Sequence, residues 1–160
     1  MASRFYLTPY SAELAGLANY PQLTTVNGIP ALGYDAATNE SAVWSVRLPT
    51  GLTGTPTLVV DCMMASATSG DVDLDASVMA VTAGDALDLD ATTSYAAVNS
   101  TDNTAVPATA GYLFTVSITL TNFDSGAAGD FVRLMLTRDA ASDTAAGDLY
   151  ILGAMIEDAA

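Results

Sequence analysis

The sequence contains no histidine and no lysine, and it has a single cysteine, Cys62. Without histidine, neither a Ser-His-Asp nor a Cys-His nucleophile can form within one chain. Without lysine, Schiff-base chemistry and the lysine of phosphate-binding loops are excluded, and a lone cysteine cannot form an internal disulfide. The usual ligand sets of zinc and iron are missing for the same reason. These absences predict a protein that is not an enzyme and has no catalytic residues.

Positive charge is also scarce, because only Arg4, Arg47, Arg133 and Arg138 oppose 18 acidic residues, leaving a formal net charge of −14. A chain of this charge repels phosphate backbones and anionic lipid surfaces. We therefore expect no nucleic-acid partner and no membrane partner. No apolar stretch approaches the ~20 residues of a membrane helix. The first residues lack a continuous apolar segment, so we expect no signal peptide and synthesis in a cytoplasm.

From residue 31 onward, apolar side chains recur at every second position. The alternating segments are residues 42–48, 57–64, 71–80, 112–121, 132–137 and 150–156. Alternation with period two is typical of strands with one buried face, and no long helical pattern competes with it. With 51% apolar residues in a chain of 160, one domain can bury a substantial core. The sequence predicts an all-β fold: an antiparallel, jelly-roll-like β-sandwich over residues 31–160.

The phase of this alternation predicts which residues face the core. We expect the core to contain Trp44, Val60, Cys62, Leu74, Tyr112, Phe114, Ile118, Leu134 and Leu152. Four of the turns between segments carry Gly-Asp pairs, which begin at Gly70, Gly84, Gly129 and Gly147. Glycine adopts positive φ without strain, and aspartate accepts a hydrogen bond from a nearby backbone N–H. The Gly-Asp pairs are therefore interpreted as turn residues rather than as ligand sites.

Residues 1–30 show no sustained period and contain three of the prolines. We expect an extended N-terminal arm, with a short helix over residues 11–18 as an option. Its scattered apolar side chains are too many to leave in water, so the arm predicts an interface with another chain. The predicted interface residues are Tyr6, Leu7, Tyr10, Leu14, Leu17 and Tyr20.

Two acidic clusters are the weak candidates for a Ca²⁺ site, because Ca²⁺ prefers oxygen ligands. The first contains Asp71, Asp73 and Asp75, and the second contains Asp85, Asp88 and Asp90. Neither fits an EF-hand loop, and a row of aspartates also suits a hydrated strand that resists aggregation. The hydrated surface is the preferred interpretation, so no cofactor is expected. Asp124-Ser125-Gly126 matches the short aspartic-protease triplet, and we interpret it as a turn.

Several stretches resemble a group of small proteins that tailed bacteriophages encode among their virion structural genes. The phrases that carry the resemblance are residues 27–35, 40–44, 63–71 and 138–148, and the likeness spans roughly residues 27–157. That group is similar to the jelly-roll domains of head-decoration, head-fibre and tail-fibre proteins. The resemblance implies a non-enzymatic virion protein, often a homotrimer, and no catalytic residues to carry over.

The leading hypothesis from the sequence is therefore a capsid-decoration or fibre-type subunit located in the virion. Its partners would be further copies of itself and other virion proteins, such as a major capsid or tail protein, and a host-surface glycan is a further candidate ligand. The alternative is a free-standing carbohydrate-binding jelly-roll module. Such a module needs exposed aromatic rings. The candidates for those rings are Tyr6, Tyr10, Tyr20 and Tyr95.

Overall fold

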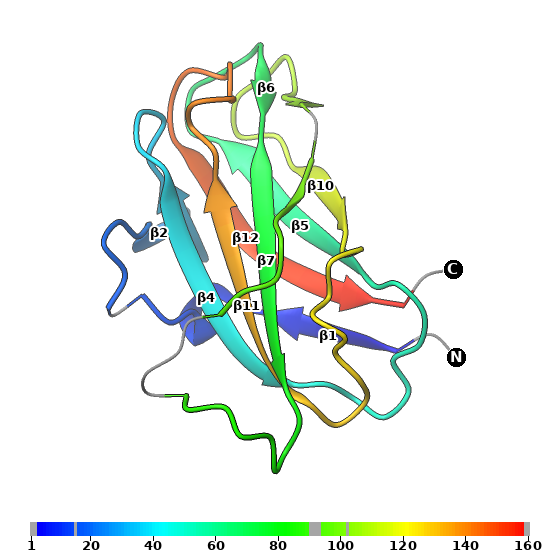
Figure 1. Ribbon diagram of the computed structural model, residues 1–160. Coiled ribbons are helices and arrows are strands. Elements are labelled where there is room, and N and C mark those ends of the chain that lie inside the picture. Colours follow the sequence, from blue (N-terminus) through cyan, green and yellow to red (C-terminus); the bar gives the residue numbers. More distant parts are fainter. Residues whose placement is uncertain (1–2, 15, 90–93, 102, 159–160) are drawn as a thin grey trace.

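Two antiparallel sheets pack face to face in the computed structural model, which describes residues 3–14, 16–89, 94–101 and 103–158 (Figure 1). One sheet has six strands in the order β10-β5-β12-β3-β2, with β1 pairing to β12 beyond the end of β3. The other has four strands in the order β4-β11-β7-β8, and β6 and β9 form a separate pair. This arrangement confirms the predicted all-β sandwich. No helix in the described part of the chain is long and apolar enough to cross a membrane.

The strands have the following bounds. The six-stranded sheet contains β1 (Arg4–Leu7), β2 (Gln22–Val26), β3 (Ile29–Tyr34), β5 (Thr57–Met64), β10 (Phe114–Thr119) and β12 (Leu149–Glu157). The four-stranded sheet contains β4 (Glu40–Arg47), β7 (Leu74–Val81), β8 (Asn99–Ser100) and β11 (Phe131–Arg138). The small pair is β6 (Asp71–Val72) with β9 (Thr104–Ala105), and a 3-10 turn, η1, spans Pro9–Ser11.

The core lies between the two large sheets, and most of its predicted members are there. Trp44, Val60, Cys62, Leu74, Ile118 and Leu134 are fully buried, and Phe114 packs against them at the margin. The indole Nε1 of Trp44 donates a 2.9 Å hydrogen bond to the carbonyl of Thr8, so the largest core side chain has no unpaired polar group. Burial raises the pKa of the Cys62 thiol far above its usual range, which makes this cysteine inert.

Leu152 was predicted in the core, and this prediction is wrong. The register of β12 against β5 shifts between Ile151 and Gly153, which is the signature of a β-bulge. One extra residue changes the phase of the alternation, so Ile151 is fully buried while Leu152 is only half-buried. After the bulge, Ala154 and Ile156 face the core as the sequence predicted. Before it, the same shift leaves Tyr150 outside the core.

Tyr112 was also predicted to face inward, and it is instead 63% exposed. The strand β10 begins only at Phe114. Tyr112 lies in the preceding turn, where its N–H donates to the carbonyl of Thr109 and Gly111 has a φ of 80°. The apolar alternation in the sequence begins at residue 112, before β10 starts at Phe114. The pattern therefore does not show where the turn ends and the strand begins.

Residues 1–30 differ from the predicted arm. β1 pairs with β12 through residues from Arg4↔Glu157 to Leu7↔Ala154, and Leu7 is 1% exposed. Leu7 is therefore a core residue and cannot belong to an interface. β3 pairs with β12 only as far as Ile151, so β1 supplies the partner that the second half of β12 lacks. The described residues of the segment 11–18, which exclude Ala15, do not form the predicted short helix, and the 3-10 turn η1 covers Pro9–Ser11.

The Gly-Asp turns have the predicted geometry, because Gly70, Gly84, Gly129 and Gly147 all adopt positive φ. At Gly70 the requirement is also steric, since an added Cβ would lie 2.7 Å from the carbonyl oxygen of Thr144. The carboxylates of Asp85 and Asp130 accept backbone N–H bonds from Thr82 and Ala127, at 3.0 and 2.8 Å. These contacts confirm the interpretation as turn chemistry for Asp85 and Asp130.

The bulge in β12 allows a direct test with two adjacent residues. We expect Ile151→Ala to lower the free energy of unfolding by about 2–5 kcal/mol, because it opens a cavity in the core. Leu152→Ala should cost less than about 1 kcal/mol, since this side chain is half-buried and leaves no enclosed cavity. Urea denaturation of both variants measures the difference. A larger cost for Leu152→Ala than for Ile151→Ala would show that β12 continues without the bulge and that Leu152 faces the core.

Candidate functional site

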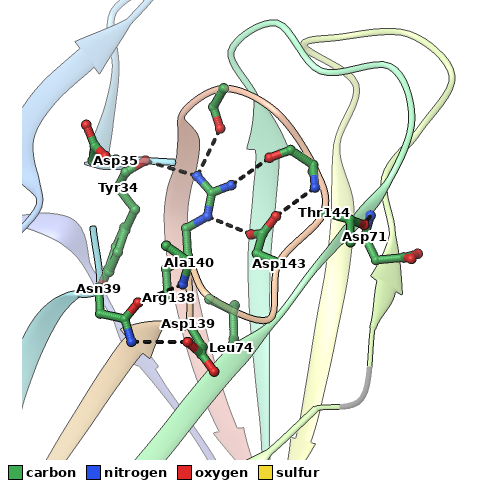
Figure 2. Close-up of polar contacts among 12 residues, drawn as sticks. Tyr34, Asp35, Asn39, Asp71, Leu74, Arg138, Asp139, Ala140, Asp143 and Thr144 are labelled. Carbon is green, nitrogen blue, oxygen red and sulfur yellow. Dashed lines mark hydrogen bonds and ion pairs between the residues drawn. The ribbon is translucent and has the colours of Figure 1, made fainter. Parts of the chain in front are cut away.

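The side chain of Arg138, at the end of β11, is fully buried and makes several hydrogen bonds (Figure 2). Its Nε donates to a carboxylate oxygen of Asp143 at 2.7 Å, and the Asp143 side chain is only 2% exposed. Nη1 donates to the carbonyls of Tyr34 at 3.3 Å and Gly147 at 2.9 Å, and Nη2 donates to the carbonyl of Ala145 at 3.1 Å. These contacts use four of the five N–H donors of the guanidinium.

The loop that follows Arg138 is held by further polar contacts. The carboxylate of Asp139 accepts hydrogen bonds from the hydroxyl of Ser142 at 2.8 Å and the amide of Asn39 at 3.1 Å. These bonds, that of Ser142 above all, hold the pKa of Asp139 below its usual value. Asn39 also accepts the N–H of Ala140 at 2.9 Å, as Figure 2 shows. The start of the loop is thus tied, through Asn39, to the turn between β3 and β4.

A polar pocket of about 190 Å³ lies beside this network. It is lined by Gln22, Thr24, Gly33, Asp35, Glu40, Asp148 and Tyr150. Gly33 and Tyr150 are paired neighbours on β3 and β12, and the residues next to them, Leu32 and Ile151, face the core. The pocket therefore opens on the outer face of the six-stranded sheet.

The buried arginine positions the backbone beneath this pocket. Arg138 binds the carbonyls of Tyr34 and Gly147, the residues directly before Asp35 and Asp148. Asp35 stands next to the first of these contacts in Figure 2. Since a guanidinium presents its donors in a rigid fork, both segments are fixed relative to one another. The Arg138 network thus fixes the backbone just before Asp35 and Asp148, two of the residues whose carboxylates line the pocket.

Tyr150 forms the aromatic wall of the pocket. Its ring lies against Gly33 on the adjacent strand, where an added Cβ would be 3.2 Å from the ring carbon Cε1. A Cβ at this position would press on the ring, so glycine lets the ring rest closely on the backbone of β3.

Glu40 brings a third carboxylate into the pocket. One of its oxygens accepts the backbone N–H of Asp35 at 2.7 Å. Partial burial raises the pKa of Glu40, and the neighbouring charges of Asp35 and Asp148 act in the same direction. The pocket consequently has a negative electrostatic potential.

Within the described residues, the first predicted calcium cluster does not form a metal site, and the second includes Asp90, which the structure does not describe. Among the residues that the structure describes, no group of three His, Cys, Asp or Glu could hold a metal ion. Asp75 accepts a short hydrogen bond from the hydroxyl of Ser100, Asp85 caps the turn at Thr82, and Asp90 lies outside the described residues. Asp124 of the protease-like triplet lies in a turn, and its carboxylate accepts the backbone N–H of Ala80 on β7 at 2.9 Å.

The predicted interface residues are divided between surface and interior. Tyr6, Tyr10 and Tyr20 are 55%, 66% and 49% exposed, whereas Leu14 packs against the core. Leu17 is half-buried, and so is Tyr95, which was a candidate sugar-binding ring and not an interface residue. Docking of the exposed tyrosines onto another chain stays a prediction.

Sequence reasoning missed Tyr150 and the residues around it. The alternation placed Tyr150 in the same phase as the core residues Ala154 and Ile156, and only the bulge separates them. The pairing of Gly33 with Tyr150 joins positions more than a hundred residues apart. The one available signal was the Asp of the Gly147-Asp148 turn, which was interpreted as turn chemistry alone.

Comparisons with known proteins show the fold. No family model matches the sequence, and no curated protein matches it. Among solved structures, the family 35 carbohydrate-binding module from Cellvibrio japonicus Abf62 aligns with a TM-score of 0.51 at 13% identity, over 96% of this chain and 92% of that one. This likeness supports a jelly-roll β-sandwich.

Two further modules align with lower scores. The C-terminal family 6 carbohydrate-binding module of LamC, a laminarinase from Zobellia galactanivorans, has a TM-score of 0.46 at 12% identity, over 96% of this chain and 98% of that one. A family 28 module described as specific for non-crystalline cellulose has a TM-score of 0.48 at 12% identity, over 91% and 86%. None of these structures indicates a virion protein.

The buried ion pair gives a stability prediction. We expect Arg138→Met to lower the free energy of unfolding by about 3–5 kcal/mol, because it leaves the Asp143 carboxylate buried without its partner. Arg47→Met is the matched control, since Arg47 is exposed and the change should stay within about 0.5 kcal/mol. Chemical denaturation measures both. Similar stabilities for the two variants would contradict the role assigned to Arg138.

The raised pKa of Glu40 predicts a pH dependence of stability. The folded state binds this proton more tightly than the unfolded chain, so Glu40 destabilises the fold as pH rises through the interval between its ordinary and its raised pKa. In Glu40→Gln this loss should be absent, because the amide oxygen can still accept the N–H of Asp35. We expect the melting temperature of the variant to gain on that of the wild type as pH rises above the ordinary pKa of glutamate, and then to level off once Glu40 is ionised in the folded state. A difference that does not change with pH would contradict the prediction.

Proposed function

We propose that this chain is a non-catalytic carbohydrate-binding module that holds a sugar in the Tyr150 pocket. The observation that carries the proposal is an aromatic ring placed at the wall of a polar pocket on an outer sheet face. A sugar presents an apolar C–H face and a rim of hydroxyl groups, which an aromatic wall with polar neighbours complements. The likeness in fold to a family 35 carbohydrate-binding module supports the same function.

Each lining residue has a definite part in this proposal. The ring of Tyr150 stacks against the apolar face of the sugar. Gln22 and Thr24, on the neighbouring strand β2, supply an amide and a hydroxyl that can both donate and accept hydrogen bonds. The carboxylates of Asp35 and Asp148 accept hydrogen bonds from sugar hydroxyls, and bonds to charged acceptors are stronger than neutral ones.

The residues available support binding without catalysis. Carboxylates are the only acid–base groups that the pocket offers besides the tyrosine hydroxyl, and glycoside hydrolysis needs two of them on opposite sides of the bond. The three pocket carboxylates come from the turn between β3 and β4, the first residue of β4 and the residue before β12. Hydrolysis is therefore an outcome to be checked in the binding experiment rather than a second proposal.

The virion hypothesis retains only its sequence resemblance. Homotrimer formation and contacts with capsid or tail proteins stay predictions. The alternative stated from the sequence, a carbohydrate-binding jelly roll, has both the fold likeness and the pocket in its support.

Removal of the aromatic wall tests the proposal. We expect Tyr150→Ala to weaken binding at least about tenfold, since the stacking contact is lost. Tyr112→Ala removes an exposed ring that does not line the pocket and should bind like the wild type. A glycan array identifies the ligand, calorimetric titration gives the affinities, and chromatography of the mixture detects hydrolysis.

Three results would count against the proposal. The wild type could bind no glycan on the array, Tyr150→Ala could bind as tightly as the wild type, or the ligand could be cleaved. Thermal denaturation of both variants ensures that lost binding is not lost folding.

A further inference from the structure

A second tyrosine stands on the same outer face, further along β12. Tyr6 of β1 pairs with Met155, and its ring lies over Gly153, where an added Cβ would be 2.7 Å from the ring carbon Cε1. The arrangement repeats that of Tyr150 over Gly33. In each case a tyrosine ring rests on a glycine of the adjacent strand, once where β12 meets β3 and once where it meets β1.

The bulge in β12 creates the room for this second ring. Because the register shifts between Ile151 and Gly153, it is Gly153 that stands opposite Asp61, a position on the outer face of β5. Without the shift, Leu152 would occupy that position, and its side chain would displace the ring of Tyr6. The same irregularity thus places Tyr150 outside the core and gives Tyr6 its support.

The ring of Tyr6 is held in one orientation and is still available to a ligand. Its hydroxyl donates a short hydrogen bond to the carboxylate of Asp61, while the residue remains 55% exposed. That hydrogen bond is the main cause of the raised pKa of Tyr6. A fixed and exposed ring loses little conformational entropy when a ligand stacks on it.

We propose that Tyr150, Tyr6 and the β12 segment between them form one binding track for a linear, uncharged oligosaccharide. This inference rests on the proposed function and names the class of ligand for the same site. Tyr150 and Gly153 are three residues apart on β12, which corresponds to at most about 10 Å of strand. A single sugar in the pocket contacts only Tyr150, whereas a longer chain lying along β12 also reaches Tyr6.

The charges along the track favour an uncharged chain. Asp35, Glu40 and Asp148 lie at one end and Asp61 at the other. Arg4, on the same strand as Tyr6, forms an ion pair with Glu157, with 3.1 Å between its Nε and a carboxylate oxygen. Uronate sugars would bring negative charge next to these carboxylates, and the net charge of −14 adds to the repulsion.

The length dependence of binding tests the track. The probes are cello-, manno- and xylo-oligosaccharides, each from the monosaccharide to the hexasaccharide, with oligogalacturonates as the charged series. For the wild type we expect an affinity gain of about tenfold once the neutral chain is long enough to reach Tyr6. Tyr6→Ala should lose this gain and keep the affinity for the shortest ligand that binds. Tyr112→Ala should keep both.

A second variant protects the test against misfolding. Tyr6→Leu keeps apolar cover over Gly153 but has no aromatic face, so it should lose the same gain while melting near the wild type. A length dependence unchanged in both variants, or oligogalacturonates binding as tightly as neutral chains, would overturn the track. If Tyr150→Ala still abolishes binding in that case, the proposed function stands without it. If no probe binds the wild type and the glycan array is also blank, both fail.

Discussion

One buried guanidinium governs how the two sheets meet at one end of the sandwich. Arg138 extends from β11 of the four-stranded sheet and binds the carbonyl of Tyr34 on β3 of the other sheet. Burying a charge costs several kcal/mol unless it is paired and hydrogen bonded, and here Asp143 and three carbonyls provide the pairing. Tyr34 reinforces the link, because its hydroxyl donates to the carbonyl of Leu136 on β11 at 3.2 Å.

The geometry of the candidate site depends on this network of hydrogen bonds. The segments bound by Arg138 lead directly into Asp35 and Asp148, so the pocket and the interior of the fold share the same contacts. A polar pocket with preformed walls binds a flexible ligand without first ordering the protein, which reduces the entropic cost of binding. In the proposed function, rigidity at the base of the pocket serves ligand binding as well as stability.

Strand β12 connects the two proposed elements of binding. Its inner face packs Ile151, Ala154 and Ile156 into the core, and its outer face presents Tyr150 and supports Tyr6 at Gly153. The bulge between Ile151 and Gly153 serves both faces, because it sets which side chains are buried and leaves a glycine under the second ring. Bulges often redirect side chains in this way next to binding sites.

Period-two alternation and turn glycines were enough to predict an all-β sandwich, since both are local properties of strands and turns. They also identified core residues such as Trp44 and Leu134, and the missing histidine and lysine excluded most catalytic chemistry. Only the tertiary structure decided that Leu7 is core, that Leu152 is not, and that Arg138 is buried. The reason is that partner strands, bulges and ion pairs join distant segments, whose register no local pattern encodes.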